Sequence, residues 1–392
     1  MRHAFALILA AGTALYALPA FAVDGTAFAE RLKVIYAEQG GGGEIAYDNV
    51  ETSGEDVTLK GVKFKVPPAT EFPLGDLMFG GVTEEDGNFI VETVTVPDLN
   101  TTSEQSTIAM KGFVIENLVV PSEANTTTPF LLYDRAAVSE VSVGIAGKQA
   151  FTMKDYEVLI DAPEPDKEIA FTSEAKSIFV DVAGLASDPK SLEQAKALGL
   201  EQIDGRLIMN GSWVAEKGSL DVSEFSFDVP NAGKINLTMA FDGYTKEFMK
   251  TLQEVSKATQ AAGTDENAQA AQGLAMLGLM QQLAYVSTKA RYDDAGLANR
   301  ALDLTAKEQN TTREALIAQG KAVMPLMLGQ LQNPEFATAV STAVGKFLDD
   351  PKSIEIDATP AAPVPGAMLM ATGAGNPMEL IKTLNVTVKA NE

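Results

Sequence analysis

The side chains best suited to ligand binding or catalysis in this sequence are carboxylates, of which it has 53. Glu84, Glu85 and Asp86 lie together in the stretch TEEDGNF, residues 83–89, and carboxylate oxygens are preferred calcium ligands. A calcium-binding loop alternates its oxygen ligands along the chain, and this stretch does not. The pair Asp86-Gly87 is typical of a tight hairpin turn, so the sequence favours a turn over a metal site.

Two pairs of adjacent aspartates, Asp293-Asp294 and Asp349-Asp350, have the residue type that hydrolysis by two carboxylates requires. Both pairs lie where we expect a turn or the end of a helix, and a solvated cap is the usual role of an aspartate there. A carboxylate-dependent hydrolase therefore remains a minor alternative.

Two other kinds of side chain suggest binding. Trp213, the single tryptophan, can stack on a sugar ring, but packing in the core or at an edge is the favoured interpretation. Met276, Met280, Met324 and Met327 lie on expected helices and suit an adaptable apolar surface. Core packing is again the favoured interpretation for these methionines.

The start of the chain has the pattern of a secretory signal peptide. Arg2 and His3 form a basic start, residues 4–18 are apolar, and Ala20-Phe21-Ala22 is a small-x-small exit. The apolar run is shorter than the roughly 20 residues that a membrane-spanning helix needs, and no second run is long enough. We expect cleavage after Ala22 and a soluble periplasmic protein, with an uncleaved anchor as the alternative.

Cleavage would remove Arg2 and the single histidine, leaving 29 basic and 53 acidic residues and a net charge of −24. The mature chain would have neither histidine nor cysteine. This excludes zinc sites built on imidazole or thiolate, Ser-His-Asp and Cys-His catalysis, and disulfides. The acidic balance argues against nucleic acid and against electrostatic binding to anionic membranes. We expect no cofactor, no metal and no catalytic residue.

A strand pattern with a phase slip recurs along the first 230 residues. In VTLKGVKFKVP, residues 57–67, Val57 and Leu59 alternate in one phase, whereas Val62, Phe64 and Val66 alternate in the other. The slip falls at Lys60-Gly61, and similar stretches that run toward a proline cover residues 89–97, 108–121, 151–163 and 220–230.

A β-bulge, in which two residues lie opposite one, would keep all these apolar side chains on one face and curve the sheet. A tight turn between two short strands is the alternative, because Lys-Gly has turn chemistry. The bulge predicts one shared apolar face for Val57, Leu59, Val62, Phe64 and Val66.

The remaining pattern predicts an α+β fold with two parts. Residues 23–185 are expected to form a β-rich domain with a curved, bulged antiparallel sheet, preceded by a helix near 24–38. Residues 186–392 are expected to form an α+β domain, an antiparallel sheet covered by helices at about 246–283 and 312–348. Asp188-Pro189 is expected to begin a short helix that ends near Leu198.

Several stretches give the chain a family resemblance. VTLKGVKFKVP, MKGFVIENLVVP, ARYDDAGLANRALDLTAKEQN and the closing segment from FLDDPKSIEIDATP to NVTVKANE resemble uncharacterised exported proteins of Gram-negative bacteria. More loosely, the strand-rich segments are similar to AsmA-like envelope proteins. That resemblance implies a curved sheet whose apolar groove receives lipid, and it implies no catalytic residues.

The leading hypothesis is therefore a non-enzymatic periplasmic protein that binds an apolar envelope component, a lipid, or supports envelope integrity, alone or with another envelope protein. The alternatives are an extracellular structural or carbohydrate-binding module and, third, the hydrolase. The side chains expected to contact the ligand lie in the repeated strands: Val62, Phe64, Phe113, Ile115, Tyr156, Val158, Phe225 and Phe227.

Overall fold

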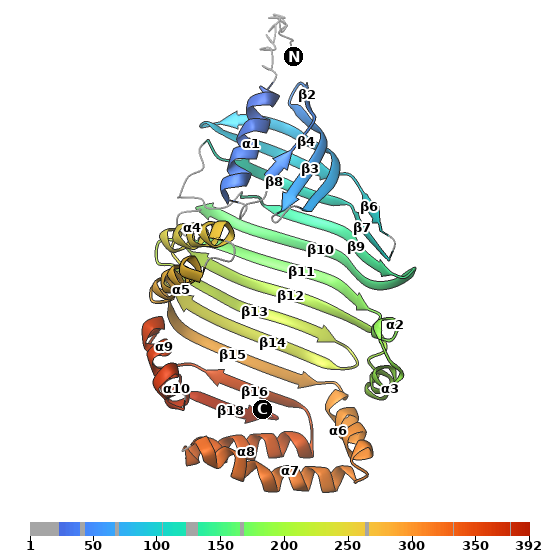
Figure 1. The fold of residues 1–392 in the computed structure, drawn as a ribbon, viewed down its shortest axis with the longest axis vertical. Helices are drawn as coiled ribbons and strands as arrows, with labels where there is room; N and C mark the ends of the chain where they lie inside the picture. The colour runs from blue at the N-terminus through green and yellow to red at the C-terminus, as the bar shows by residue number, and fades with distance from the viewer. Residues whose placement is uncertain are drawn as a thin grey trace, which may run out of the picture.

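The fold is built around one large antiparallel sheet (Figure 1). The structure, a computed structural model, describes residues 23–39, 44–66, 70–103, 105–122, 132–164, 168–262, 266–331, 333–376 and 378–392. All 18 strands found in these residues belong to that sheet, and most of the helices lie around its margins. The α+β class and the curved, bulged antiparallel sheet predicted from the sequence are confirmed. The signal-like segment, residues 1–22, lies outside the described residues.

The N-terminal part contains one helix and eight strands. They are α1 (Gly25–Gln39), β1 (Glu44–Ala46), β2 (Asn49–Ser53), β3 (Asp56–Val66), β4 (Thr70–Glu85), β5 (Asn88–Val96), β6 (Leu99–Thr102), β7 (Ser106–Lys111) and β8 (Phe113–Val120). β1 and β2 both pair with β3, and the sheet continues through β4 and β5 to β8. Asp86 and Gly87, both with positive φ, join β4 to β5, so the predicted hairpin turn is confirmed.

The central strands follow one another in sequence. They are β9 (Arg135–Ile145), β10 (Lys148–Glu164), β11 (Glu168–Val180), β12 (Ile203–Val214), β13 (Ser219–Val229) and β14 (Gly233–Asp242). β9 pairs with β8 and with the short β6–β7 hairpin, and β11 pairs with β12 along ten residues. The sheet therefore passes without interruption from residues 23–185 into residues 186–392.

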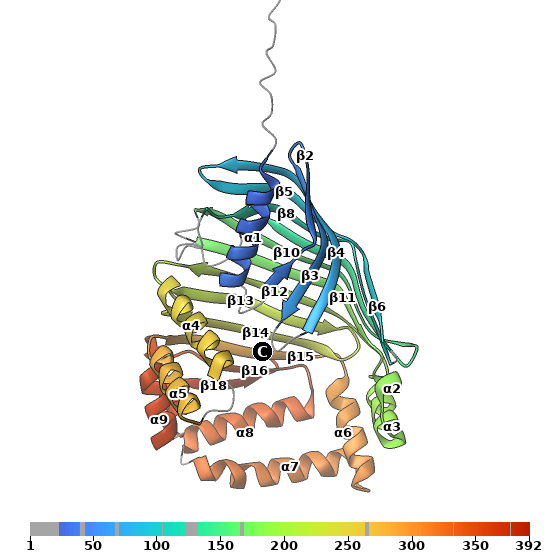
Figure 2. The same cartoon turned by 45° about the horizontal axis from the view of Figure 1, so that its top comes forward.

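The last strands form the C-terminal end of the sheet. They are β15 (Ala284–Asp294), β16 (Ser353–Ala358), β17 (Val364–Pro365) and β18 (Val386–Ala390). β16 lies between β15 and β18, and β17 pairs with the other end of β15. Figure 2 shows that strands at the N-terminal end, such as β3 and β4, cross the direction of β13–β15 steeply.

Most helices lie in the connections between consecutive strands. They are α2 (Val182–Leu185), α3 (Pro189–Leu198), α4 (Lys246–Ala262), α5 (Glu266–Met280), α6 (Leu297–Glu308), α7 (Arg313–Leu328), α8 (Pro334–Asp349), α9 (Gly366–Gly375) and α10 (Glu379–Thr383), with the short 3₁₀ helix η1 (Gly329–Leu331). Asp188 accepts hydrogen bonds from the backbone of the first turn of α3, so this predicted cap is confirmed.

The predicted bulge at Lys60-Gly61 is confirmed. Leu59 pairs with Leu77 and Val62 with Gly75, so residues 60 and 61 lie opposite the single residue Asp76. Gly61 has a φ of +61°, a conformation that glycine adopts without steric cost. Val57, Leu59 and Val62 are buried in one cluster and Phe64 packs against it, so they share a face despite their mixed parity. The side chain of Val66 lies outside the described residues.

Asp76 holds this bulge from the partner strand. Its carboxylate accepts hydrogen bonds from the backbone N–H of Gly61 at 3.0 Å and from Lys60 Nζ at 3.0 Å. The Gly61 N–H, and then the Lys60 ammonium, lower the pKa of Asp76. Related contacts occur at two other glycines, because Asp56 accepts a hydrogen bond from the Gly81 N–H and Asp98 accepts one from the Gly112 N–H.

The bulge prediction is wrong for residues 89–97, 108–121 and 151–163. In the last of these, Met153 pairs with Ile178 and Tyr156 with Ala175, so the register does not change across Lys154-Asp155. The neighbouring strand makes the same slip at the same place, which keeps the apolar residues of both strands on one face. We call this arrangement a paired slip.

Paired slips extend across several strands. One includes β4, β5 and β8, where Phe79, Val94 and Ile115 are paired in turn and Val82, Val91 and Leu118 are paired in turn. A second runs from β5–β6 to β11. It ends at an ordinary bulge, where two residues between Ala175 and Ile178 lie opposite one residue of β12.

Helix α1 covers the N-terminal end of the sheet, where the first core lies. Phe28, Leu32 and Ile35 of α1 are buried as the helical spacing predicts, and Phe28 makes edge contacts with Phe79 and Phe89. A second, smaller core packs Phe248 and Met249 of α4 and Leu279 of α5 against the strand residues Ile169 and Trp213.

Candidate functional site

A single row of mostly apolar residues crosses the sheet from β3 to β18. Each member of the row is paired with the next on the neighbouring strand, and directly paired residues lie on the same face of a sheet. The row is Val57, Phe79, Val94, Ile115, Ala136, Val158, Ser173, Met209, Phe225, Leu237, Ala290, Ile356 and Val388. At about 4.8 Å for each strand, the row is roughly 58 Å long.

Burial along this face changes from one end to the other. Val57, Phe79 and Val94 are buried in the core under α1. By contrast, Phe225 is 38% exposed and Ile356 49% exposed. Ile235, which pairs with Phe227 on the same face, is 54% exposed. The face therefore changes from a sealed core to an apolar surface in contact with solvent.

The open part of the face lies between the helices. In Figure 1, α4, α5, α9 and α10 flank one end of the central strands, α2 and α3 flank the other, and α8 lies along β16 and β18. No helix is drawn across the middle of β11–β15 (Figure 1). We call the apolar side chains of β11–β16 on this side the open face: Phe171, Leu207, Met209, Phe225, Phe227, Ile235, Leu237, Met239, Ile354 and Ile356.

Two glycines of β12 leave room for aromatic rings to pack directly against the backbone of this strand on the open face. A Cβ added to Gly205 would lie 2.7 Å from Phe227 Cζ and 2.9 Å from the Asp228 carbonyl oxygen. A Cβ added to Gly211 would lie 2.5 Å from Phe171 Cζ. The rings of Phe171 and Phe227 therefore lie directly over the backbone of β12 and form part of the surface available to a ligand.

The bulge at Ser223-Glu224 positions Phe225, and it is confirmed. Val222 pairs with Met239 and Phe225 with Leu237, so residues 223 and 224 lie opposite one residue of β14. Glu224 lies on the opposite face, where it accepts hydrogen bonds from Lys234 Nζ and Ser226 Oγ. These partners, Lys234 first, lower the pKa of Glu224.

The opposite face of the sheet is polar and carries ion pairs between neighbouring strands. Arg135 lies between Glu116 and Glu157, at 2.7 and 2.5 Å. Further along, Arg206 pairs with Glu174 at 2.8 Å, and Lys289 lies within 4 Å of both Glu355 and Asp357. Because this face is solvated, only the apolar face requires a cover.

The eight predicted contact residues lie on the apolar side of the sheet, but in two settings. Val62 is buried, and Phe64, Phe113 and Ile115 pack against the core under α1. Tyr156 and Val158 are partly buried on β10, whereas Phe225 and Phe227 belong to the open face. Their role in ligand binding stays a prediction.

Sequence reasoning missed the part of this face that lies on β14 and β16. Ile235, Leu237 and Met239 alternate in KINLTMAFD, as do Ile354 and Ile356 in SIEIDA. The alternation of apolar and polar residues in these strands was visible in the sequence. Their position beside Phe225 and Phe227, however, depends on which strands pair, and the sequence does not reveal that.

The aspartate pairs have structural roles. Asp294 accepts hydrogen bonds from the backbone N–H groups of Gly296 and Ala298 at the start of α6, both at 2.8 Å. Asp293 pairs with Arg291 at 2.7 Å. In the other pair, Asp349 bonds to Lys321 and Asp350 to Lys352. These contacts agree with the turn and helix-end roles that were favoured over catalysis.

Trp213 is buried, and its Nε1 donates a hydrogen bond to the Tyr244 carbonyl oxygen at 2.6 Å. The core interpretation is therefore confirmed for this tryptophan. For two of the methionines the core interpretation is wrong, because Met276 and Met327 are exposed. Both lie on helices at the margin of the sheet, where one side of each helix meets solvent.

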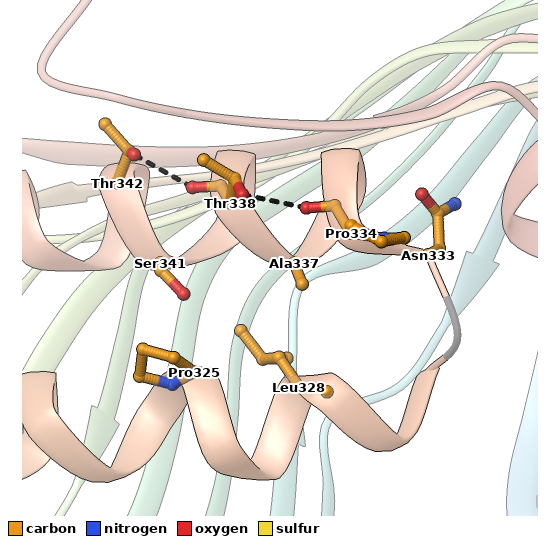
Figure 3. Close-up of a pocket in the computed structure, with 9 residues that line it drawn as sticks. Pro325, Leu328, Asn333, Pro334, Ala337, Thr338, Ser341 and Thr342 are labelled. Atoms are coloured by element: carbon orange, nitrogen blue, oxygen red, sulfur yellow. Dashed lines mark hydrogen bonds between the residues drawn. The ribbon is translucent and has the colours of Figure 1, made fainter.

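A cavity of about 490 Å³ lies between the end of α7 and the start of α8. Pro325 and Leu328 face Ala337 and Ser341 across it (Figure 3). Thr338 and Thr342 donate their hydroxyl protons to helix carbonyl oxygens four residues earlier, both at 2.8 Å. The lining has no charged side chain, so this cavity suits apolar groups better than charged ligands.

In the described part of the chain, no three side chains of metal-binding type gather into a group. Among the same residues, no helix combines the length and apolar character needed to cross a membrane. A sequence model of a family described as an uncharacterised protein matches residues 226–391. No curated protein matches this sequence significantly.

Proposed function

We propose that this protein binds a lipid through the open face of its sheet. The observation that carries the proposal is the continuous apolar face along this row, which is sealed under α1 but exposed at Phe225, Ile235 and Ile356. Exposed apolar area of this kind on a sheet is costly in water and marks a surface that a ligand or partner covers. A bound ligand would cover this exposed apolar area, so no additional protein segment would be needed to shield it.

The dimensions of the open face suit an acyl chain. From β11 to β16 there are five strand-to-strand steps, which correspond to about 24 Å. An acyl chain that fills one leaflet occupies about half of the roughly 30 Å hydrocarbon core of a bilayer. One extended chain therefore fits along the row, in contact with Met209, Phe225 and Leu237.

The charge of the protein supports a ligand whose binding depends on apolar contact. The sequence has a net charge of −23, and the open face itself is lined by uncharged side chains. An anionic headgroup would gain no attraction from this protein as a whole. Export through the N-terminal segment, with cleavage after Ala22 and location in the periplasm, is part of the same proposal; the exported protein should begin at Val23.

The test measures binding of a fluorescent long-chain fatty acid to the purified protein. Phe225→Asp places a charge in the middle of the open face, and we expect it to weaken binding by about tenfold or more. Leu159→Asp is the matched control, because Leu159 is 43% exposed, similar to Phe225, but lies on the polar face beside Val158. This control should bind the probe as the wild type does.

Circular dichroism would establish that both variants are folded. Native mass spectrometry of the protein isolated from its own compartment would then identify any lipid that purifies with it. A wild-type protein that does not bind the probe, or equal losses in the two variants, would contradict lipid binding at the open face.

A further inference from the structure

A second apolar surface lies at one margin of the molecule, and it is formed by helices. Leu326 is 76% exposed, Leu274 71% and Met327 67%, the three highest values among the large apolar side chains of the described residues. We call this surface the helical edge. It comprises Leu274, Met276 and Leu277 of α5, Leu326 and Met327 of α7, Met368 of α9, and Met378 at the start of α10.

The elements of the helical edge lie along one margin of the molecule. The backbone N–H of Gly366, the first residue of α9, donates to the Leu283 carbonyl oxygen at 2.8 Å, just after α5. α9 packs against α10. Both views place α5, α9 and the C-terminal end of α7 along the same margin of the sheet, with α9 between α5 and α7 (Figures 1 and 2).

The same elements come from uncharged parts of the sequence. Residues 267–288, 322–334 and 358–378 contain no Asp, Glu, Lys or Arg, although the whole chain has 53 acidic and 30 basic residues. These three stretches hold all seven apolar residues of the helical edge. Glu266 at the start of α5 and the body of α10 lie outside them. The cavity between α7 and α8 takes part of its lining from the second stretch, and all of its lining residues are uncharged.

We propose that the helical edge docks on the surface of a lipid bilayer and that an electrically neutral bilayer suits it best. Exposed Leu and Met side chains on helices gain free energy when they enter the acyl region of a bilayer. Most peripheral membrane helices add basic residues that attract anionic lipids. Here the three stretches that hold the edge residues contain no basic residue, and the net charge of −23 repels an anionic surface.

Charge also favours a bilayer over a second copy of this chain as the occupant. Two copies joined through their helical edges would bring together two molecules that each carry −23. A neutral bilayer imposes no such repulsion. Methionine side chains are flexible and adapt to an irregular apolar environment, which suits acyl chains.

This inference rests on the proposed lipid binding and specifies where the lipid comes from. The Phe241 and Tyr285 rings, 5.9 Å apart, are paired on β14 and β15 at the end of the open face. Tyr285 lies two residues after Leu283, which contacts α9. A docked helical edge therefore places the end of the open face next to the membrane surface.

The test is flotation of the purified full-length protein with vesicles of phosphatidylcholine. We expect the wild type to float with the vesicles and Leu326→Asp/Met327→Asp to lose about tenfold or more of its partitioning. Val34→Asp/Leu185→Asp is the control, because it adds the same charge at two exposed apolar residues of α1 and α2, away from the edge. The control should float as the wild type does.

Adding phosphatidylglycerol to the vesicles should weaken binding at low salt, and raising the salt should restore it. Docking is overturned if the wild type does not float, if the edge variant floats unchanged, or if anionic lipid strengthens binding. It is also overturned if the protein forms a stable dimer that the edge variant abolishes.

Failure of docking and failure of the proposed function give different results. Phe225→Asp should lose the fatty-acid probe but still float with vesicles. The edge variant should bind the probe but not float. Wild-type protein that floats but does not bind the probe would contradict lipid binding at the open face and leave docking supported.

Discussion

Beneath α1, the apolar face of β3, β4 and β5 is a closed core, whereas from β12 to β16 the same face of the same sheet meets solvent. Both regions use period-two alternation, and both contain a bulge that keeps a slipped strand in phase. They differ in what lies above the strands, because α1 crosses one region and the helices of the other lie at its margins (Figure 1). The pattern that makes a sheet apolar on one side does not determine whether that side becomes a buried core or a surface exposed to solvent.

The largest expected effect separates the two regions by stability. Phe79→Ala removes a buried ring that contacts Phe28 at a centroid distance of 5.0 Å, and should lower the free energy of unfolding by about 3–5 kcal/mol. Phe225→Ala removes a ring that is already partly in water, and should cost less than about 1.5 kcal/mol. Urea unfolding measures both values. Equal losses would show that the open face is a core in solution.

A smaller effect compares the two bulges. Gly61→Ala places a side chain at a φ of +61°, which should cost about 1–2 kcal/mol. Neither residue of the bulge in β13 has a positive φ, so Ser223→Ala should change the free energy of unfolding by less than about 0.5 kcal/mol. Gly54→Ala is the control for conformation, since Gly54 has a similar φ and open space around its Cβ position.

If Gly54→Ala costs as much as Gly61→Ala, the backbone conformation explains the whole loss. A larger loss at Gly61 would show that the contact with Asp48, whose Oδ2 lies 2.2 Å from the added Cβ, also contributes. No loss at Gly61 would contradict the bulge geometry.

The smallest effect concerns acid stability. The pKa of Asp76 is lowered from its ordinary 3.8 by the Gly61 N–H and by Lys60, and that of Glu224 from 4.5 by Lys234. A lowered pKa gives stability that is present above the ordinary value and is lost as the pH falls through the lower, folded-state value. Asp76→Asn and Glu224→Gln should each flatten the decline of stability below about pH 4.5.

Unfolding measured at several pH values between neutral and strongly acidic tests this expectation. Asp303 is a useful control, because Arg313 lowers its pKa at a site remote from both bulges. Asp303→Asn should also flatten the decline of stability at low pH, but it should leave the two bulges and the apolar face unchanged. Profiles for Asp76→Asn and Glu224→Gln that match the wild type would show that these carboxylates do not stabilise the bulges.

The sequence predicted the local features of this fold well. The slips at Lys60-Gly61 and Ser223-Glu224, the turn at Asp86-Gly87 and the buried face of α1 each depend on residues close together in the chain. The paired slips were not predicted, because they require a neighbouring strand to slip at the same place. Ile178 and Ala175 show no unusual pattern until they are set beside Met153 and Tyr156.

The candidate site was predicted less completely for the same reason. Phe225 and Phe227 were chosen from a strand pattern, but their exposure depends on where α4, α5 and α8 lie. Met276 and Met327 were assigned to the core because apolar helices usually pack there. The position of a helix relative to the sheet depends on contacts between distant segments, which alternation and helical spacing do not reveal.

The order of the strands has a consequence for how this protein can change in length. From β9 to β16, each strand pairs with the next one in sequence, so contacts in this region are mostly between neighbours. Inserting or losing one hairpin would lengthen or shorten the apolar row by about 10 Å without altering the pairing elsewhere. Gain or loss of a single hairpin would thus change the length of the apolar face in steps of two strands.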